Sequence, residues 1–183
     1  MLTLRRIFAL ALVSIACASK LNPRQATNTN AAISAAVDKV DEAMHQAGPT
    51  ILTLQADHKL STATLSTQFT NMEKAFTTLK TTLAATPVSS GSTTVAPTND
   101  EIGVTLSDAV ALVATTLSGI KATGVVPGFP TMVATFDPIL SGALAQYNIT
   151  LPGALSLVHI MMLDASQFLV DEGFTKTLAT LGF

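Results

Sequence analysis

The sequence has little cysteine, few aromatic residues and little charge, and each shortage excludes a class of protein. Among its 183 residues there is one cysteine, Cys17, so a framework of intrachain disulfides is excluded. Charged residues make up 12 % of the chain, about half of their usual share in soluble domains. The formal net charge of −2 provides no basic surface for nucleic acid. Apolar packing must therefore stabilise the fold, and uncharged polar residues must cover it.

The N-terminus has the features of a secretory signal peptide. Arg5 and Arg6 form a short basic region, and the apolar run of residues 7–18 ends in an Ala-x-Ala cleavage pattern. The run is too short to span a membrane, which leaves an amphipathic anchor or a buried helix as the alternatives. We expect residues 1–18 to be removed together with Cys17, and residues 19–29 to form a flexible leader.

Residues 61–83 carry the clearest pattern in the chain. Large apolar residues recur there at steps of four and three, which is the spacing of one face of an α-helix. They are Leu65, Phe69, Met72, Phe76, Leu79 and Leu83. A lone helix in water leaves such a stripe exposed, so the stripe needs other helices or an apolar ligand.

The start of this helix has two interpretations. Ile51 and Leu54 extend the stripe toward the N-terminus, so we favour one helix over residues 50–85. Alternatively, the helix breaks near Asp57 and Ser61 caps a new one. Residues 30–48 keep helical spacing before it, and we expect Gly48-Pro49 to end or kink that first helix.

A third helix follows a loop. Residues 86–98 are rich in proline, serine and threonine, which predicts a loop and a segment suited to O-linked sugar. Thr98 and Glu101 then have the spacing of a capping box at a helix start. The apolar spacing continues to Ile120, and glycines and prolines interrupt the chain after it.

Two further helices complete the expected fold. Thr131 can cap the fourth helix, which Asp137-Pro138 interrupts or restarts. Pro152 can open the fifth helix, and Gly173 is its expected C-terminal cap. Since no segment has the alternation of a strand, we predict an all-α fold, an antiparallel bundle of about five helices over residues 30–183 without disulfides.

The sequence contains no recognisable catalytic group and implies no cofactor. There is no G-x-S-x-G motif, and the expected mature chain has no thiol. Asp41 and His45, four residues apart, could share a metal ion, but we interpret them as part of a solvated acidic face. His58 and His159 are interpreted as hydrogen-bonded, partly buried side chains. We therefore expect a protein that is not an enzyme and holds no metal.

Methionine and phenylalanine on the apolar helix faces are the candidate ligand-binding residues. Such flexible or flat side chains suit an irregular apolar ligand between helices, and simple core packing is the alternative for each of them. The candidates are Phe69, Met72, Phe76, Leu79, Val113, Leu117, Phe136, Leu155, Val158 and Met162. Separately, residues 148–150 form an N-glycosylation acceptor at Asn148, which we expect to lie between two helices.

Three segments resemble a known family. ISAAVDKVDEAM at residues 33–44, STATLSTQFTNMEKAFTTLKTTL at residues 61–83 and LSDAVALVATTLSGI at residues 106–120 resemble the fungal hydrophobic surface-binding protein A family, which includes cell-wall galactomannoproteins. The resemblance implies a non-enzymatic secreted protein. It implies adsorption to hydrophobic surfaces, recruitment of secreted hydrolases, or binding of fatty-acid-like amphiphiles.

Two functional hypotheses follow from the composition and the resemblance. In the first, the protein binds a hydrophobic surface or a lipid through apolar helix faces and recruits a secreted hydrolase there. In the second, it is a structural cell-wall mannoprotein, and the bundle is a scaffold for sugar. Both place the protein outside the cell or in its wall, without a transmembrane span or a nucleic-acid partner.

Overall fold

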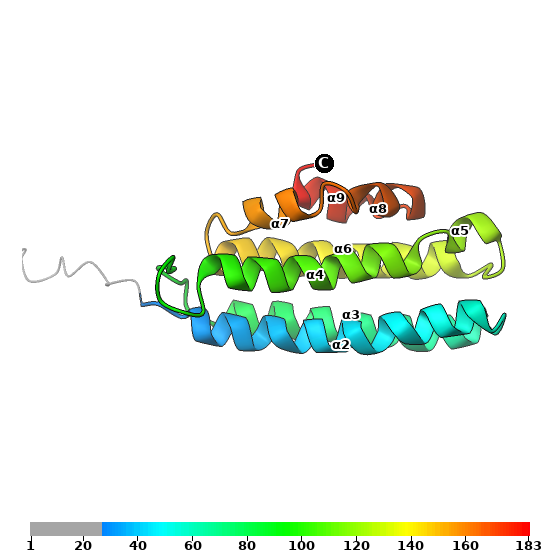
Figure 1. The fold of residues 1–183 in the computed structure, drawn as a ribbon, viewed down its shortest axis with the longest axis horizontal. Helices are drawn as coiled ribbons and strands as arrows, with labels where there is room; N and C mark the ends of the chain where they lie inside the picture. The colour runs from blue at the N-terminus through cyan, green and yellow to red at the C-terminus, as the bar shows by residue number, and fades with distance from the viewer. Residues whose placement is uncertain (1–26) are drawn as a thin grey trace, which may run out of the picture.

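The computed structural model describes residues 27–183, which fold into a helical bundle (Figure 1). Four long helices and several short ones are arranged in three layers. The elements are α2 (Asn30–Ala56), α3 (Thr62–Ala85), α4 (Asn99–Leu117), α5 (Ile120–Thr123), α6 (Phe129–Thr150), α7 (Leu155–Met161), α8 (Ser166–Glu172) and α9 (Thr175–Leu181). The prediction of an all-α bundle is confirmed, although the described part has more helices than five. The predicted signal peptide and most of the predicted leader lie outside the described residues.

The three layers follow the order of the chain. In Figure 1, α2 and α3 form one layer, α4 and α6 form the middle layer, and α7, α8 and α9 cover the opposite side. α2 packs on α3 and α4, and α6 packs on α3 and α9. Successive long helices run antiparallel, so every long helix can bury its apolar stripe against two neighbours.

The favoured prediction of one helix over residues 50–85 is wrong, because the chain breaks between α2 and α3. His58 adopts a left-handed backbone conformation with φ of 56°, which no helix continues through. Ser61 caps α3 in a capping box, in which its hydroxyl accepts from the Thr64 N–H and the Thr64 hydroxyl accepts from the Ser61 N–H. The alternative break near Asp57 is therefore the correct interpretation.

Two prolines that we expected to mark breaks lie inside helices. Pro49 lies within α2 and Pro138 lies within α6. Each helix buries apolar side chains on both sides of its proline, including Met44 and Ile51 in α2. Tertiary burial on both sides outweighs the local cost of a missing hydrogen bond, which is about 3 kcal/mol for an interior proline.

The loop at residues 86–98 is predicted correctly and is fixed to the start of α2. The Ser89 hydroxyl donates to the side-chain oxygen of Asn30 at 2.7 Å, and the Asn30 amide donates to Asn99 at 2.9 Å. The predicted capping box of Thr98 and Glu101 is present at the start of α4. The loop therefore joins the N-terminal ends of α2 and α4 through buried polar contacts.

Two buried carboxylates cap helices that are distant from them in sequence. Asp137 lies in the middle of α6 and accepts from the backbone N–H groups of Lys176 and Thr177, both at 2.8 Å, in the first turn of α9. Glu172 at the end of α8 accepts from the N–H groups of Gly119 and Lys121 around the start of α5. These bonds satisfy donors that a helix start leaves unpaired.

The C-terminal half departs from the predictions in three places. α6 begins at Phe129, with Pro130 in its first turn, rather than after a Thr131 cap. Asp137 neither interrupts nor restarts α6, because its carboxylate is bonded to α9. The predicted fifth helix is two short helices, α7 and α8, with turns between them, although Gly173 ends α8 in the expected left-handed conformation.

One stretch of the bundle is apolar enough to cross a membrane. Asn99–Thr123, which covers α4 and α5, is 25 residues long, and an 18-residue window of it has a mean hydropathy of 1.4. Of that window, 56 % is buried inside the bundle. α4 contacts α2, α7 and α8, so it lies at the centre of the fold. Its place in the core accounts for its composition.

Replacing Asp137 with asparagine will destabilise the bundle. An amide offers one acceptor oxygen where the carboxylate offers two, so one N–H of the α9 start loses its partner. We expect Asp137→Asn to lower the free energy of unfolding by about 1–3 kcal/mol in urea titrations. Asp164→Asn, at an exposed position, is the control. Equal stability of the two variants would show that the cap contributes nothing.

Candidate functional site

The predicted ligand-binding residues lie together in the packed interior. Nine of them are at most 2 % exposed, and Leu155 is partly buried against the same core. The nine are Phe69, Met72, Phe76, Leu79, Val113, Leu117, Phe136, Val158 and Met162. They belong to one apolar core built from α3, α4, α6 and the α7 segment. Burial of this kind is what a well-packed protein core shows.

Aromatic rings fill the middle of the interior. Phe136 of α6 lies 5.7 Å from both Phe69 and Phe76 of α3, measured between ring centroids. It also lies 6.0 Å from Phe174, the residue before α9, in an edge-to-face arrangement. Phe129 contacts Phe69 in the same way at 5.9 Å. These distances are within the favourable range for ring pairs, so the rings occupy the space of an internal ligand.

A small gap remains beside Gly48, and it is too small for a water molecule. Met44, Met72 and Val113 are among its lining residues. A methyl group on Gly48 would lie 3.1 Å from the Thr116 hydroxyl, a tight contact that favours glycine where α2 approaches α4. The gap thus leaves no room for an acyl chain.

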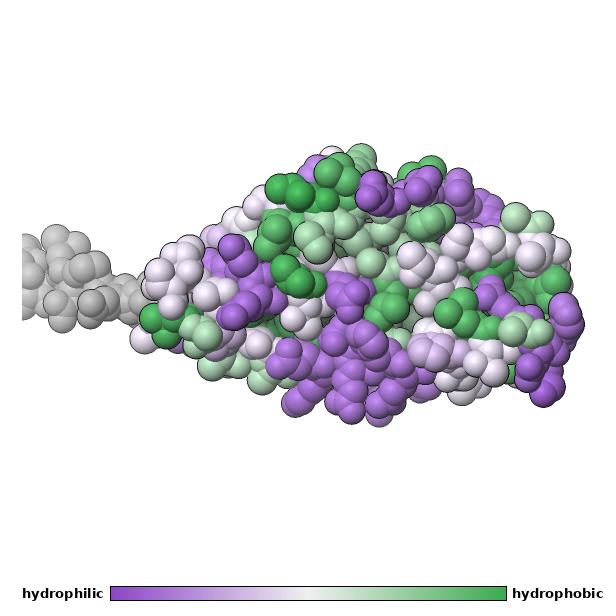
Figure 2. Space-filling view, in the orientation of Figure 1, coloured by the Kyte–Doolittle hydropathy of each residue, from purple (hydrophilic) through white to green (hydrophobic). Residues whose placement is uncertain are grey.

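Large apolar side chains are exposed on the outer layer instead. Ile160 and Met161 of α7 and Leu163 just after it are 58 %, 49 % and 56 % exposed. We call these three residues the α7 apolar face. Figure 2 shows hydrophobic side chains gathered over α7, while hydrophilic side chains gather over the middle of α2. On this face of the molecule, an apolar part of the surface over α7 is therefore separated from a polar part over the middle of α2.

The exposure follows from which side of the short helix α7 faces the core. The seven-residue helix turns Val158 toward the core, and Met162 just after it is also buried. The residues between and beyond these two point outward because one side of a helix can face the core. Nearby, His159 Nδ1 donates to the Leu181 carbonyl at 2.8 Å, and the ring stacks on exposed Phe183 at 4.5 Å.

A groove of about 320 Å³ connects the apolar and polar parts of the surface. Met161 of the α7 apolar face lines it together with Val104 of α4, which is 46 % exposed. Asp41 and Asp108 line its polar side. An apolar wall beside a pair of carboxylates is thus presented on one side of the molecule.

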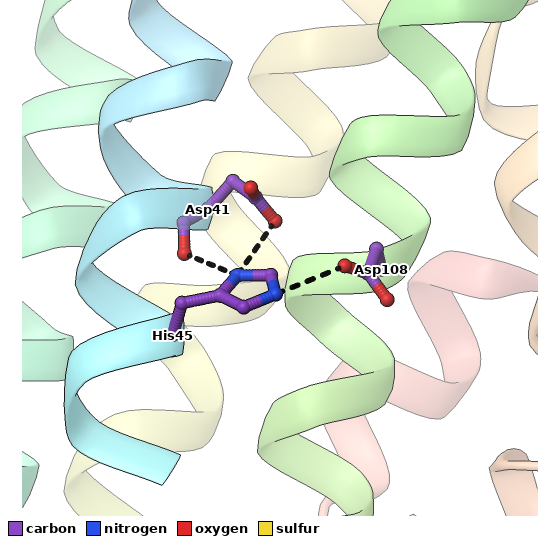
Figure 3. A group of neighbouring side chains, drawn as sticks. All are labelled: Asp41, His45 and Asp108. Carbon is purple, nitrogen blue, oxygen red and sulfur yellow. Dashed lines mark hydrogen bonds and ion pairs between the residues drawn. The ribbon is translucent and has the colours of Figure 1, made fainter. Parts of the chain in front are cut away.

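The polar side of this groove holds a cluster from two helices (Figure 3). His45 Nδ1 lies 3.0 Å from the backbone oxygen and 3.4 Å from the Oδ1 atom of Asp41, one turn earlier in α2. His45 Nε2 lies 3.6 Å from the Oδ2 atom of Asp108 on α4. The hydrogen bond to the Asp41 carbonyl raises the pKa of the His45 imidazole, and the two carboxylates raise it further. Burial raises the pKa of the Asp41 carboxyl.

Two further hollows lie away from this side. A groove of about 570 Å³ runs between α2 and α3, with alanines in its walls and Lys39 and Lys74 on opposite helices. A pocket of about 350 Å³ lies at the end of the bundle beside His58, Leu60 and Val125. His58 is exposed there, so the prediction of a partly buried histidine is wrong for this residue.

The predicted glycosylation site lies in a helix rather than between helices. Asn148 is in the last turn of α6, where its side chain is exposed and accepts from the Gly153 N–H at 3.2 Å. The Thr150 hydroxyl is buried and donates to the Leu83 carbonyl at 3.1 Å. The asparagine is therefore accessible, whereas the threonine is part of the folded core.

Sequence reasoning finds part of this surface and misses the rest. The i, i+4 spacing identifies Asp41 and His45, but no pattern links them to Asp108, which is 63 positions from His45. The α7 apolar face lies within the predicted fifth helix, whose inner and outer sides the apolar spacing does not separate. Ile160 and Met161 are large apolar residues that widen the apolar stripe of this helix, and this widening is the signal that could have revealed the face.

The single tyrosine reports whether the interior is packed in solution. Tyr147 is fully buried, its hydroxyl has no hydrogen-bond partner in the described structure, and burial raises its pKa far above 10, with the charge of Asp100 adding to the effect. The folded state therefore keeps the neutral phenol. The stability that burial of the neutral phenol contributes is present below the ordinary tyrosine pKa of about 10, and it decreases as the pH rises above that value.

We expect tyrosinate absorbance of Tyr147 at 295 nm to appear only together with loss of helical circular dichroism. Ionisation near pH 10 in a fully helical protein would contradict the packed interior.

Comparison with known proteins adds no family assignment. No protein-family model matches the chain, and no curated protein matches its sequence. The resemblance to the hydrophobic surface-binding family therefore rests on the three helical segments alone. The function has to be argued from the packed interior and from the surface of the bundle.

Proposed function

We propose that this is a secreted, non-enzymatic protein that adsorbs to hydrophobic surfaces through the α7 apolar face. The observation that carries the proposal is the exposure of Ile160, Met161 and Leu163 side by side on the outer layer. Large apolar residues scattered singly are ordinary, but a contiguous group of them on a weakly charged protein favours an interaction surface. The interior is occupied by protein side chains, so an acyl chain or a waxy surface would contact the bundle from outside.

The size of the apolar face fits reversible adsorption. Burying the exposed half of an isoleucine, methionine or leucine side chain contributes on the order of 1 kcal/mol. The three residues together contribute about 3–4 kcal/mol, which corresponds to millimolar affinity for one contact. Val104 beside the groove adds apolar area. The low charge matters as well, because few ionised groups have to lose water when this side meets a surface.

If the layer of α7, α8 and α9 adsorbs to a surface, the layer of α2 and α3 stays in water. α7, α8 and α9 lie on the side opposite to α2 and α3 (Figure 1). A molecule attached through α7 presents the groove between α2 and α3 to the solvent. In this proposal, that layer is the one available to a secreted hydrolase, which the adsorbed protein would concentrate at the surface.

A second candidate function is a glycosylated scaffold of the cell wall. The observation that favours it is the row of exposed threonines on the outer side of α3 and in the following loop, among them Thr77, Thr81 and Thr94. Several of these hydroxyls donate to the carbonyl one turn earlier. Location separates the two candidates: a heavily glycosylated protein retained in the wall supports the scaffold, and a lightly glycosylated protein in the medium supports adsorption.

The adsorption proposal predicts the behaviour of a triple variant. Ile160→Gln, Met161→Gln and Leu163→Gln together remove the apolar contacts without touching the core. Losing about 3 kcal/mol corresponds to a roughly 100-fold weaker affinity, so we expect at least a tenfold rise in the protein concentration that half-saturates polystyrene beads. The measurement is depletion of the protein from solution at physiological salt.

The control carries the same number of substitutions at apolar residues elsewhere. Leu52→Gln, Val88→Gln and Val95→Gln change residues that are 50–62 % exposed on α2 and in the loop before α4. This variant should adsorb within twofold of the original protein. Equal losses in both variants would mean that adsorption depends on general hydrophobicity, and the α7 apolar face would have no special role.

A further inference from the structure

Three metal-binding side chains meet where α2 approaches α4. Asp41 and His45 lie one turn apart on α2, and Asp108 lies on α4 (Figure 3). One potential ligand atom from each residue lies within 4.8 Å of the others. A carboxylate and an imidazole four residues apart share one side of a helix, as the two histidines of H-E-x-x-H zinc sites do. The third group comes from a different helix, so the fold assembles the cluster.

The orientation of His45 is the one that metal-binding histidines adopt. Its Nδ1 atom lies 3.0 Å from the Asp41 backbone carbonyl, which can only accept, so Nδ1 carries the proton and donates. In the neutral ring, Nε2 then has a lone pair, and it faces the Asp108 carboxylate. Metal-ligating histidines usually donate their second ring N–H to a carbonyl or a carboxylate in this way, which fixes the tautomer.

The distance between His45 and Asp108 also fits two ligands of one ion. Nε2 and Oδ2 are 3.6 Å apart, which is too long for a hydrogen bond. Two ligands at about 2.0–2.1 Å from a tetrahedral zinc ion lie roughly 3.3 Å apart. A side-chain movement of a few tenths of an ångström brings the pair to that separation. Asp108 is exposed and can make the movement without disturbing the core.

Asp41 supplies a carboxylate whose interactions are incomplete. Its Oδ1 atom is shielded from solvent and has no hydrogen-bond partner in the described structure. It lies close enough to Asp38 and Asp108 for their negative charges to disfavour its ionised form. Among the described residues, the carboxylates of Asp41 and Asp108 pair only with His45. A divalent cation would relieve the repulsion between them.

The adjoining groove has room for the remaining ligands of an ion. Its volume of about 320 Å³ is lined by Asp41 and Asp108, as well as by Thr105 and Ser107. Waters in such a space can complete the coordination of an ion held by three side chains. Ser107 itself donates to the Gly103 carbonyl, so it is already bonded.

We propose that Asp41, His45 and Asp108 form a binding site for a divalent transition-metal ion that links α2 to α4. One imidazole and two carboxylates are ligands that zinc accepts, and copper(II) binds the same nitrogen and oxygen atoms more tightly. The ion would join two long helices in a bundle that has no disulfide. The three ligands are not part of the α7 apolar face, although Met161 lines the same groove, so neither proposal depends on the other.

The test uses the full chain without an affinity tag, since a histidine tag would itself bind metal. Zinc binding is measured by isothermal titration calorimetry at pH 8, and cobalt(II) serves as a visible-absorption probe of the same site. We expect one equivalent of zinc to bind with micromolar affinity and to raise the thermal unfolding temperature. His45→Gln and Asp108→Asn should each weaken zinc binding at least tenfold. Both positions are exposed, so the variants will fold.

Matched control variants separate a specific site from general surface binding. His58→Gln and Asp100→Asn remove an exposed histidine and an exposed aspartate outside the cluster. They should leave the zinc affinity within twofold of the original protein. Zinc binding weaker than about 1 mM in the original protein, or an affinity that His45→Gln leaves unchanged, would overturn the proposal. Equal losses in the controls would overturn it too.

Discussion

The packing of Phe136 against three rings from two other segments is the contact on which the bundle depends. Phe136 of α6 joins Phe69 and Phe76 of α3 to Phe174 at the start of the outer layer. The chain has no disulfide to replace these contacts, and the ion pairs among the described residues lie on the surface. Truncating a buried phenylalanine to alanine typically costs 3–5 kcal/mol, which is a large part of the stability of a domain.

Two buried carboxylates make the outer layer possible. α5 and α9 are too short to be stable as isolated helices, and Glu172 and Asp137 supply acceptors for their first N–H groups. Each cap also joins elements far apart in sequence. α9 contacts α7, and α7 packs on α4 with its apolar residues directed outward. The proposed adsorption surface therefore depends on polar bonds inside the bundle.

The packed interior changes what the resemblance to surface-binding proteins implies for this chain. An amphiphile cannot enter the ring cluster without displacing phenylalanine side chains, so binding from outside costs less. The α7 apolar face and the cluster around His45 lie on either side of one groove. Hydrophobic adsorption and metal binding are thus two separate proposals for neighbouring surfaces, and each rests on its own residues.

The sequence by itself determined the parts of the fold that depend on neighbouring residues. The spacing of Leu65 to Leu83 predicted the buried side of α3, and Thr98 with Glu101 predicted the start of α4. Tertiary structure decided that α2 continues through Pro49 and that the α9 start is capped by Asp137. It also brought Asp108 to His45. Helical periodicity and capping act within about four residues, so a single sequence records them. Contacts between helices depend on how the apolar stripes pack together, and the sequence alone leaves that arrangement open.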